Sequence, residues 1–335
     1  MVSKRPAGSG QAKAKAGAAV AKARPGGSGA ASAGGRPAGA ERWAFARHVP
    51  WNDRAGRFSW LKTGVFVTLF IPAALILATL ANAVAPSAPA GNAAFGDARP
   101  VTIALHSFGD WSVRLLLLSL AVTPAMRLLR RPRLILVRRM IGVAAFLYAA
   151  SHFTLYVVDQ KFDLARVASE IALRFYLTVG FVTLVGLAVL AATSVDAVIR
   201  KMGARRWQAL HRLVYPLTAL ALFHFYLQTR LDVSEPVLMT GFFLWLMGFR
   251  LIARRSTVPV LIALAVGAAV LTGVAEVAWY GLATSVAPAR VIAADLSLAA
   301  GIRPVWWVLI IGLAIALGTA ILNRSARQSG VNRAS

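Results

Sequence analysis

The sequence contains no cysteine. Cysteine sulfur is required for disulfides, thiolate-ligated zinc, iron–sulfur clusters and covalently attached c-type heme, so the chain can use none of these. Acidic residues are also scarce, with 12 Asp and Glu against 37 Lys and Arg, and the formal net charge is +25. Any redox centre must therefore have other ligands, and the positive charge needs an explanation.

Charged residues of either sign make up only 15% of the 335 residues, whereas 58% are hydrophobic. So little polar surface cannot cover a water-soluble globule, and the composition favours a membrane protein. In a soluble protein the same net charge would suggest a nucleic-acid partner. The positions of the charges decide between these two interpretations.

Residues 1–58 are rich in Ala, Gly, Lys and Arg and lack apolar periodicity. Such a segment buries too little surface to offset the entropy lost on ordering, so a disordered basic N-terminal tail is predicted. No apolar core with a cleavage site follows the basic stretch, and a secretory signal is not expected. We expect the tail to contact anionic lipid headgroups; a nucleic-acid arm is the alternative.

Apolar stretches long enough to cross a bilayer follow the tail, and each is expected to be a helix because lipid offers no partners for backbone polar groups. They are predicted near residues 62–84, 111–128, 140–158, 175–194, 208–228, 236–253, 258–284 and 304–323. The predicted fold class is therefore an all-α membrane protein, a polytopic helical bundle followed by a short tail at residues 324–335.

Basic residues concentrate in every second connection between these predicted spans, within residues 127–139, 200–206 and 250–255. By the positive-inside rule these connections and both termini lie in the cytoplasm. The alternate connections dilute or mix their charges, as expected of an outer face. A multi-pass protein of the bacterial inner membrane, with a cytoplasmic N-terminus, thus explains the net charge without nucleic acid.

Three of the five histidines, His152, His211 and His224, fall within predicted spans. An ionisable side chain inside a bilayer costs several kcal/mol unless it has a partner, so each of the three is a functional candidate. His48 lies in the tail and His106 in an outer connection before the second span, where ordinary polar roles are expected.

Neutral imidazole is a good axial ligand for heme iron, and two imidazoles from neighbouring helices give a six-coordinate centre suited to electron transfer. His152 and His224 lie at similar depth towards the outer side of the third and fifth spans, so geometry favours this pair as the ligands of one heme. His211 lies roughly 20 Å away along the fifth span. A second, inner heme on His211 is possible, with its other ligand unassigned.

Arg138 and Arg139 lie at the depth of His211 on the third span, where they could neutralise heme propionates. On a straight helix His211 and His224 would point about 140° apart, unless Pro216 kinks or rewinds the helix. The alternative is a heme-free transporter in which the intramembrane histidines form hydrogen bonds or relay protons.

Four stretches of the sequence together resemble the ferric-reductase-like transmembrane family, and within it the heme-binding membrane subunits of bacterial periplasmic methionine sulfoxide reductase systems. They are GDWSVRLLLLSLAVTPAMR (109–127), RRMIGVAAFLYAASHFTLYVVD (138–159), YLTVGFVTLVGLAVLAATS (176–194) and GARRWQALHRLVYPLTALALFHF (203–225). The resemblance covers about residues 60–255. It implies a six-helix domain with b-type heme, in which His152, His211 and His224 match the ligand histidines of the family.

The resemblance further implies an electron-transfer subunit of an oxidoreductase system rather than its catalytic subunit. Electrons would arrive on the cytoplasmic side from a flavin reductase carrying FMN or from the quinone pool, and would leave to a periplasmic molybdopterin-dependent subunit that reduces methionine sulfoxide. No G-x-G-x-x-G motif in a strand–helix context is present to bind a dinucleotide, so the donor must be separate. A ferric-reductase-like cytochrome b with another outer acceptor is the alternative.

Residues 256–323 are predicted to form two transmembrane helices in addition to the six-helix domain, and the resemblance does not account for them. Glu276 is the one acid of the seventh span. A snorkelling or hydrogen-bonded role for Glu276 is weighed against a role in proton or quinone handling. The sequence shows no convincing nucleophile–base constellation, which disfavours hydrolysis.

Overall fold

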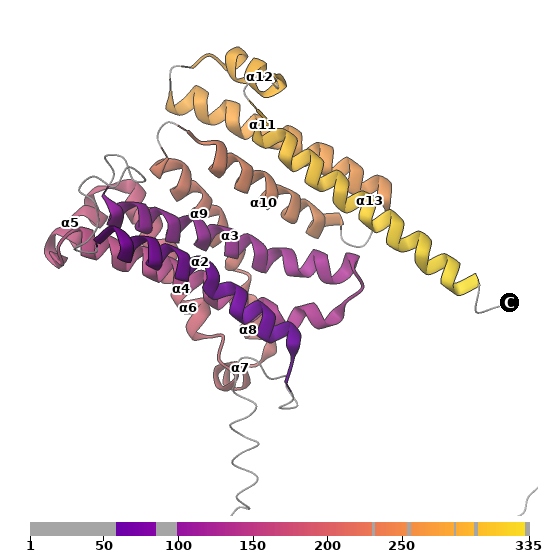
Figure 1. The fold of residues 1–335 in the computed structure, drawn as a ribbon, viewed down its shortest axis with the longest axis horizontal. Coiled ribbons are helices and arrows are strands. Elements are labelled where there is room, and N and C mark those ends of the chain that lie inside the picture. Colours follow the sequence, from indigo (N-terminus) through magenta and orange to yellow (C-terminus); the bar gives the residue numbers. More distant parts are fainter. Residues whose placement is uncertain are drawn as a thin grey trace, which may run out of the picture. The chain divides into compact units, whose positions relative to one another are not determined.

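The computed structural model describes residues 58–84, 99–229, 232–252, 256–284, 286–297 and 301–331. The predicted disordered tail lies outside the described residues except for its last residue. Within the described part, seven helices are long and apolar enough to cross a membrane. They are α2 (Trp60–Val84), α3 (Pro100–Leu128), α4 (Ile135–Asp159), α6 (Phe175–Ala192), α10 (Ser234–Ile252), α11 (Val258–Ala283) and α13 (Pro304–Val331) (Figure 1). The predicted all-α, multi-pass architecture is thereby confirmed.

The fifth predicted span, 208–228, is not one helix. A turn at Arg212 and Leu213 separates the short helix α8 (Ala204–His211) from α9 (Val214–Gln228). Pro216 explains the break, because it has no N–H for the carbonyl of Arg212 and its ring crowds that carbonyl. The amide of Tyr215 donates to this carbonyl instead, over 3.1 Å. With 15 residues, α9 is shorter than a full span requires.

The second helix begins at Pro100 rather than at residue 111, so His106 and Asp110 lie inside α3. The expectation that His106 belongs to a connection was therefore wrong. The predicted start came too late because a helix that faces lipid would be apolar there, and these two side chains are polar. In the structure both side chains face a cavity. At the other end of the chain, α13 continues to Val331, past the predicted limit at residue 323.

Short helices join the long ones. They are α5 (Leu164–Leu173), α7 (Asp196–Met202), α8, α12 (Pro288–Leu296) and a 3-10 turn at Pro132–Leu134. The Asp163 side chain accepts the Arg166 backbone N–H at 2.9 Å and so caps the start of α5. The amphipathic α5 lies where α4 ends and α6 begins, and we call this side of the molecule the α5 end (Figure 1).

α3 is the central helix of the bundle and packs against α2, α4, α9 and α10. Its Leu116 and Leu120 are almost fully buried. The two helices that the resemblance did not cover, α11 and α13, pack against each other and against α10 (Figure 1). α10 therefore connects the helices around the histidines to the C-terminal helices.

Two side chains bond to backbone groups of neighbouring helices. The Tyr148 hydroxyl of α4 accepts the Ala73 N–H at 2.9 Å and donates to the Leu69 carbonyl at 2.6 Å, so it bridges two groups of α2. Arg250 of α10 donates to the Leu120 carbonyl at 2.8 Å. That carbonyl is free because Pro124, four residues on, has no N–H.

Candidate functional site

A cavity of about 490 Å³ lies among α3, α4, α6 and α9 at the α5 end. Its size falls within the range of about 300–1,000 Å³ that is typical of small-molecule and cofactor sites. Side chains such as Val113, Phe153, Leu184 and Phe225 give it largely apolar walls. His152 and His224, which the sequence predicted to lie at equal depth, both line it.

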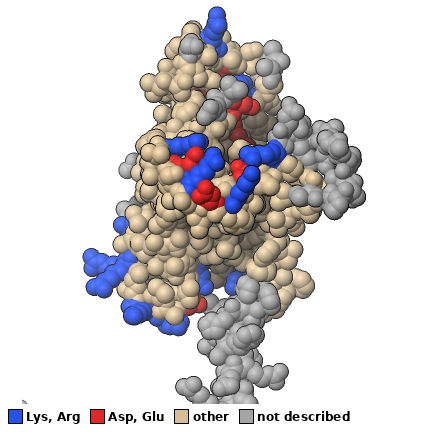
Figure 2. All heavy atoms as spheres, turned by 90° about the vertical axis from the view of Figure 1, so that its left-hand side faces the viewer, with Lys and Arg blue, Asp and Glu red and all other residues tan. Residues whose placement is uncertain are grey.

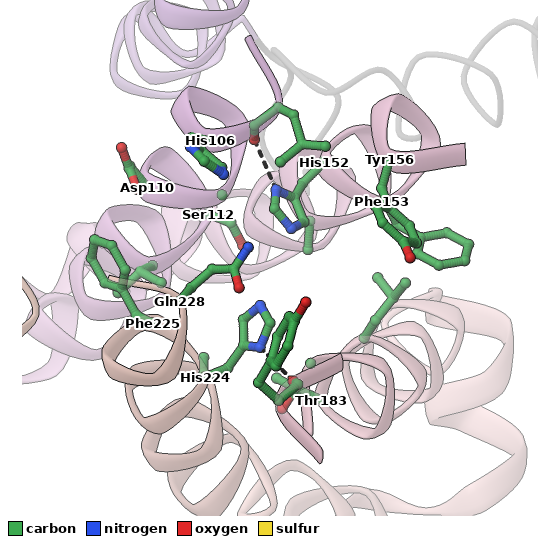
Figure 3. Close-up of a pocket in the computed structure, with 18 of the residues that line it drawn as sticks. His106, Asp110, Ser112, His152, Phe153, Tyr156, Thr183, His224, Phe225 and Gln228 are labelled. Atoms are coloured by element: carbon green, nitrogen blue, oxygen red, sulfur yellow. Dashed lines mark hydrogen bonds between the residues drawn. The ribbon is translucent and has the colours of Figure 1, made fainter. Parts of the chain in front are cut away.

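His152 on α4 and His224 on α9 point towards each other across this cavity (Figure 3). Their ring centroids are 6.4 Å apart and the ring planes are inclined by 81°. Two imidazoles bound through nitrogen to one metal ion, at about 2.0–2.1 Å each, have centroids roughly 6.2–6.5 Å apart. The two rings are thus already at the separation that a shared metal ion requires.

Backbone hydrogen bonds fix which nitrogen of each ring is free. The Nδ1 atom of His152 lies 2.8 Å from the Leu105 carbonyl, and Nδ1 of His224 lies 2.8 Å from the Tyr176 carbonyl. A carbonyl oxygen only accepts, so Nδ1 carries the proton in both rings and Nε2 keeps its lone pair. This is the arrangement by which proteins orient histidines that ligate metal ions.

Two glycines make room for the imidazoles. A Cβ atom on Gly109 of α3 would lie 2.9 Å from Nδ1 of His152, and one on Gly180 of α6 would lie 2.7 Å from Cε1 of His224. Each ring therefore lies directly against the backbone of a neighbouring helix, at a position where any larger residue would collide with it. Helices α3 and α6 hold the rings that α4 and α9 carry.

The cavity is also lined by polar side chains that were not predicted to belong to a site. They include His106, Asp110, Gln228, Asp232 and Glu235. Figure 3 shows His106 and Asp110 on the same helix, and their spacing of four residues was the signal that they share a face. Glu235 also accepts hydrogen bonds from Arg114, with Nε at 3.0 Å.

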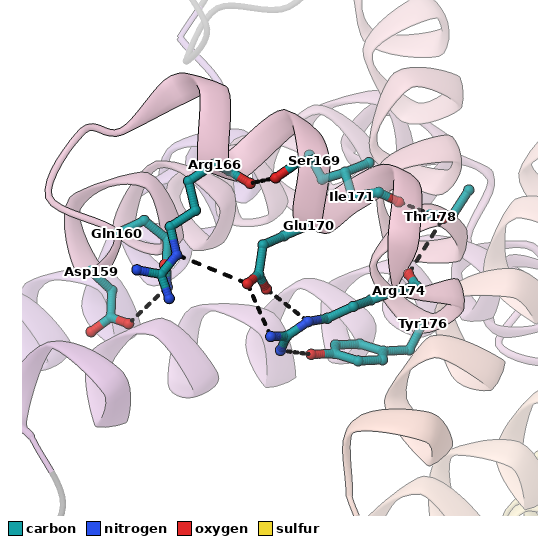
Figure 4. Close-up of polar contacts among 9 residues, drawn as sticks. All are labelled: Asp159, Gln160, Arg166, Ser169, Glu170, Ile171, Arg174, Tyr176 and Thr178. Atoms are coloured by element: carbon teal, nitrogen blue, oxygen red, sulfur yellow. Dashed lines mark hydrogen bonds and ion pairs between the residues drawn. The ribbon is translucent and has the colours of Figure 1, made fainter.

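A polar network connects α5 to the start of α6, the helix whose backbone contacts the His224 ring (Figure 4). Arg174 pairs with Glu170, with Nε 2.8 Å from Oε2, and donates to the Tyr176 hydroxyl over 3.2 Å. The carbonyl of the same Tyr176 accepts the His224 Nδ1–H. Figure 2 faces the α5 end and shows acidic and basic side chains gathered there. The start of α6, and with it the orientation of His224, is thus held by surface charges.

His211 lies apart from this cavity, at the last residue of α8 and not within a long helix as predicted. It stacks on Trp207 with centroids 3.9 Å apart, and its Nε2 lies 3.3 Å from the Ser194 hydroxyl. Nδ1 of His211 lies 3.1 Å from the Trp207 carbonyl. Burial lowers the pKa of His211, which keeps the ring neutral.

The two predicted propionate partners occupy the same region. Arg139 forms an ion pair with Asp196 at the start of α7. Arg138 lies within electrostatic range of His211 and of the Tyr215 hydroxyl. No second histidine lines this region among the described residues, and no group of three or more His, Cys, Asp or Glu side chains is arranged there to hold a metal ion. The described residues bring two imidazoles together elsewhere, in the cavity that His152 and His224 line.

Comparison with known proteins identifies the family of the chain. The family described as "Ferric reductase like transmembrane component" matches residues 108–222. This range includes His152 and the two glycines, Gly109 and Gly180, against which the histidine rings lie. The long helices and the paired imidazoles thus define a membrane protein of the ferric-reductase-like class.

Relatives within this class are more specific. Proteins named "Protein-methionine-sulfoxide reductase heme-binding subunit MsrQ" are similar to the chain in three organisms. In Rhodospirillum rubrum the identity is 40% over 162 residues, covering 46% of this chain and 75% of the relative. In Caulobacter vibrioides it is 38% (48% and 77% covered), and in Xanthomonas campestris pv. campestris 41% (50% and 78% covered). The chain therefore belongs to the MsrQ family. No solved structure gives a significant match.

Proposed function

We propose that the chain binds heme b between His152 and His224 and passes electrons across the bacterial inner membrane to a methionine sulfoxide reductase. The observation that carries this proposal is the pair of imidazoles at 6.4 Å, each with Nε2 free. Membership of a family named for heme binding supports it.

The residues around the cavity each have a part in this function. Bound heme supplies one-electron transfer at its iron. His152 and His224 would hold the heme iron through their Nε2 atoms, and iron held by two imidazoles would be suited to electron transfer rather than to oxygen chemistry. The carbonyls of Leu105 and Tyr176 hold the rings in one tautomer, and the apolar walls exclude water.

The proposed direction of electron flow combines the expected topology with the expected donor and acceptor. The connections at the ends remote from α5 are basic, so by the positive-inside rule we expect those ends in the cytoplasm and the cavity at the α5 end on the periplasmic side. Electrons would enter from a cytoplasmic flavin reductase with FMN or from the quinone pool, and would leave to a periplasmic molybdopterin-dependent subunit. The mixed charges of the α5 end offer a surface on which such a subunit can dock.

A second heme on His211, with Arg138 and Arg139 near its propionates, stays a prediction. The stacking of His211 on Trp207 and the contact of its Nε2 with Ser194 would have to give way for Nε2 to bind iron. The proposal for the first heme does not depend on it.

The test is a redox difference spectrum with heme quantitation on the purified full chain and on single variants. We expect H152A and H224A each to lose the heme of this cavity, because removal of either ligand leaves the iron with one imidazole in an apolar pocket. H106A is the matched control, since His106 lines the same cavity and is not assigned as a ligand. Full heme content in H152A and H224A would refute the pairing, and a wild type without a Soret band would favour the heme-free transporter.

A further inference from the structure

The C-terminal helices contain a buried ionic cluster that the electron-transfer function does not use. Arg303, just before α13, donates to the Glu276 carboxylate of α11 and to Oδ1 of Asp295 on α12, the latter over 3.3 Å. The Glu276 side chain is only 1% exposed and that of Asp295 10%. We call these three residues the Glu276 cluster.

Charge does not balance in the Glu276 cluster, because two carboxylates share one guanidinium. Among the described residues, the other titratable groups within electrostatic range of the cluster are Tyr226 of α9, Asp232 before α10 and Tyr280 of α11, none of them a cation. Arg114 of α3 lines a second cavity together with Arg303 but forms an ion pair with Glu235. Arg290, the other cation of α12, is exposed. Two carboxylates in a buried site with a single counter-charge take up one proton more readily than an isolated carboxylate does, and this proton titrates as a property of the pair.

Three buried oxygen atoms in or near the cluster have no hydrogen-bond partner among the described residues. They are Oε2 of Glu276, the Tyr226 hydroxyl and Oγ1 of Thr240 on α10. Tyr226 lies near Thr240 and within electrostatic range of Glu276. A buried polar atom without a partner is costly, so these three atoms are suited to share a proton or to bind a water molecule.

Helix α9 separates this polar group from the heme cavity. Tyr226 follows His224 by two residues, which places their side chains about 200° apart around the helix. The Tyr226 ring packs on Trp279, one turn along α11 from Glu276, with centroids 5.0 Å apart. The Glu276 cluster thus lies behind α9, at roughly the 10–12 Å width of one helix from the cavity.

We propose that Glu276 is a proton-accepting site whose occupancy follows the charge of the heme on the other face of α9. When the flavin or quinol donor delivers an electron to the heme, the proton affinity of the Glu276 carboxylate rises and part of the Glu276 population takes up a proton from water to become the carboxylic acid; this proton is released when the electron leaves. Arg303 and Glu235 line a second cavity of about 460 Å³, through which water can supply the proton. This inference rests on the proposed function.

The size of the coupling follows from Coulomb's law. A unit charge at about 12 Å, in a protein interior with an effective dielectric constant near 20, changes the proton affinity of a carboxylate by about tenfold. By linkage, protonation changes the affinity of the heme for an electron by the same factor, and a tenfold change corresponds to about 59 mV for one electron.

The test is a redox titration of the heme at a series of pH values, with the full chain purified in detergent and dithionite as reductant. We expect the wild-type midpoint potential to fall by at least about 59 mV from low to high pH. E276Q and D295N should each make this fall smaller by about that amount, because either change leaves one carboxylate at most for Arg303; titratable side chains of the heme cavity itself, such as Asp110 and Glu235, account for the fall that remains. D159N is the matched control, since Asp159 pairs with Arg99 at the α5 end and lines neither cavity.

An infrared redox difference spectrum provides the second measurement. Reduction of the wild type should produce the carbonyl stretch of a protonated carboxyl group, and this band should be missing in E276Q. A pH-independent wild-type potential, or a fall in potential with pH that is as large in both variants as in the wild type, would overturn the inference while the heme spectrum itself remained. A wild type without heme would instead defeat the proposed function.

Discussion

Replacing Gly180 by alanine tests the geometry of the cavity most directly. The added Cβ would lie 2.7 Å from Cε1 and 2.9 Å from Nδ1 of His224. Non-bonded carbon atoms pack at about 3.5–4.0 Å, so the imidazole must retreat by roughly 0.8 Å. Metal–ligand distances tolerate only about ±0.2 Å. The retreating ring would also stretch its bond to the Tyr176 carbonyl.

We expect G180A to weaken heme binding by about 1–3 kcal/mol, the usual cost of overpacking, or roughly 5- to 150-fold. The assay is heme content per purified protein, together with loss of heme to an excess of a heme-binding acceptor. G142A is the matched control: a Cβ on Gly142 of α4 meets nothing within 4 Å, and alanine suits a helix interior better than glycine by about 0.5–1 kcal/mol. G180A with wild-type heme content and retention would refute the reasoning.

Three other substitutions test features away from the two ligands. Y148F should destabilise the protein by about 1–3 kcal/mol, because two backbone groups of α2 lose their bridge; thermal unfolding in detergent measures this, and an unchanged midpoint would mean that α2 closes its own hydrogen bond. R250A should destabilise it to a similar extent, since the Leu120 carbonyl freed by Pro124 loses its donor; R250K, which keeps the charge, is the comparison. H211A should keep the heme between His152 and His224, which the redox difference spectrum of the variant would show. Loss of that heme would mean that His211 supports the same site.

Hydropathy was enough to predict most of the long helices, because lipid-facing residues must be apolar whatever their neighbours are. It failed where side chains face protein. His106 and Asp110 made the start of α3 look like a connection, although both belong to a spanning helix that lines a cavity. The short helices α5 and α12 lie outside the long apolar stretches, so span length gave no signal for them.

The equal depth of His152 and His224 could be predicted from sequence, since helix rise and direction fix depth. Their facing orientation could not, because the rotation of each helix depends on packing that one sequence does not reveal. The contacts of Gly109 and Gly180 with the two rings are a result of that packing. His211 was misplaced for a different reason: Pro216 was expected to kink the fifth span, and instead the span breaks, so that α8 ends at His211 and α9 begins three residues later at Val214.

Four helices that share one cavity also impose an order on the synthesis of the protein. The last of them to emerge from the ribosome is α9, which ends at Gln228. Until α9 enters the membrane, His152 has no partner and any heme is held from one side only. No residue of α11, α12 or α13 is among those that line the cavity. If heme binds as proposed, the residues that line its cavity can therefore all be in place before α11, α12 and α13 enter the membrane.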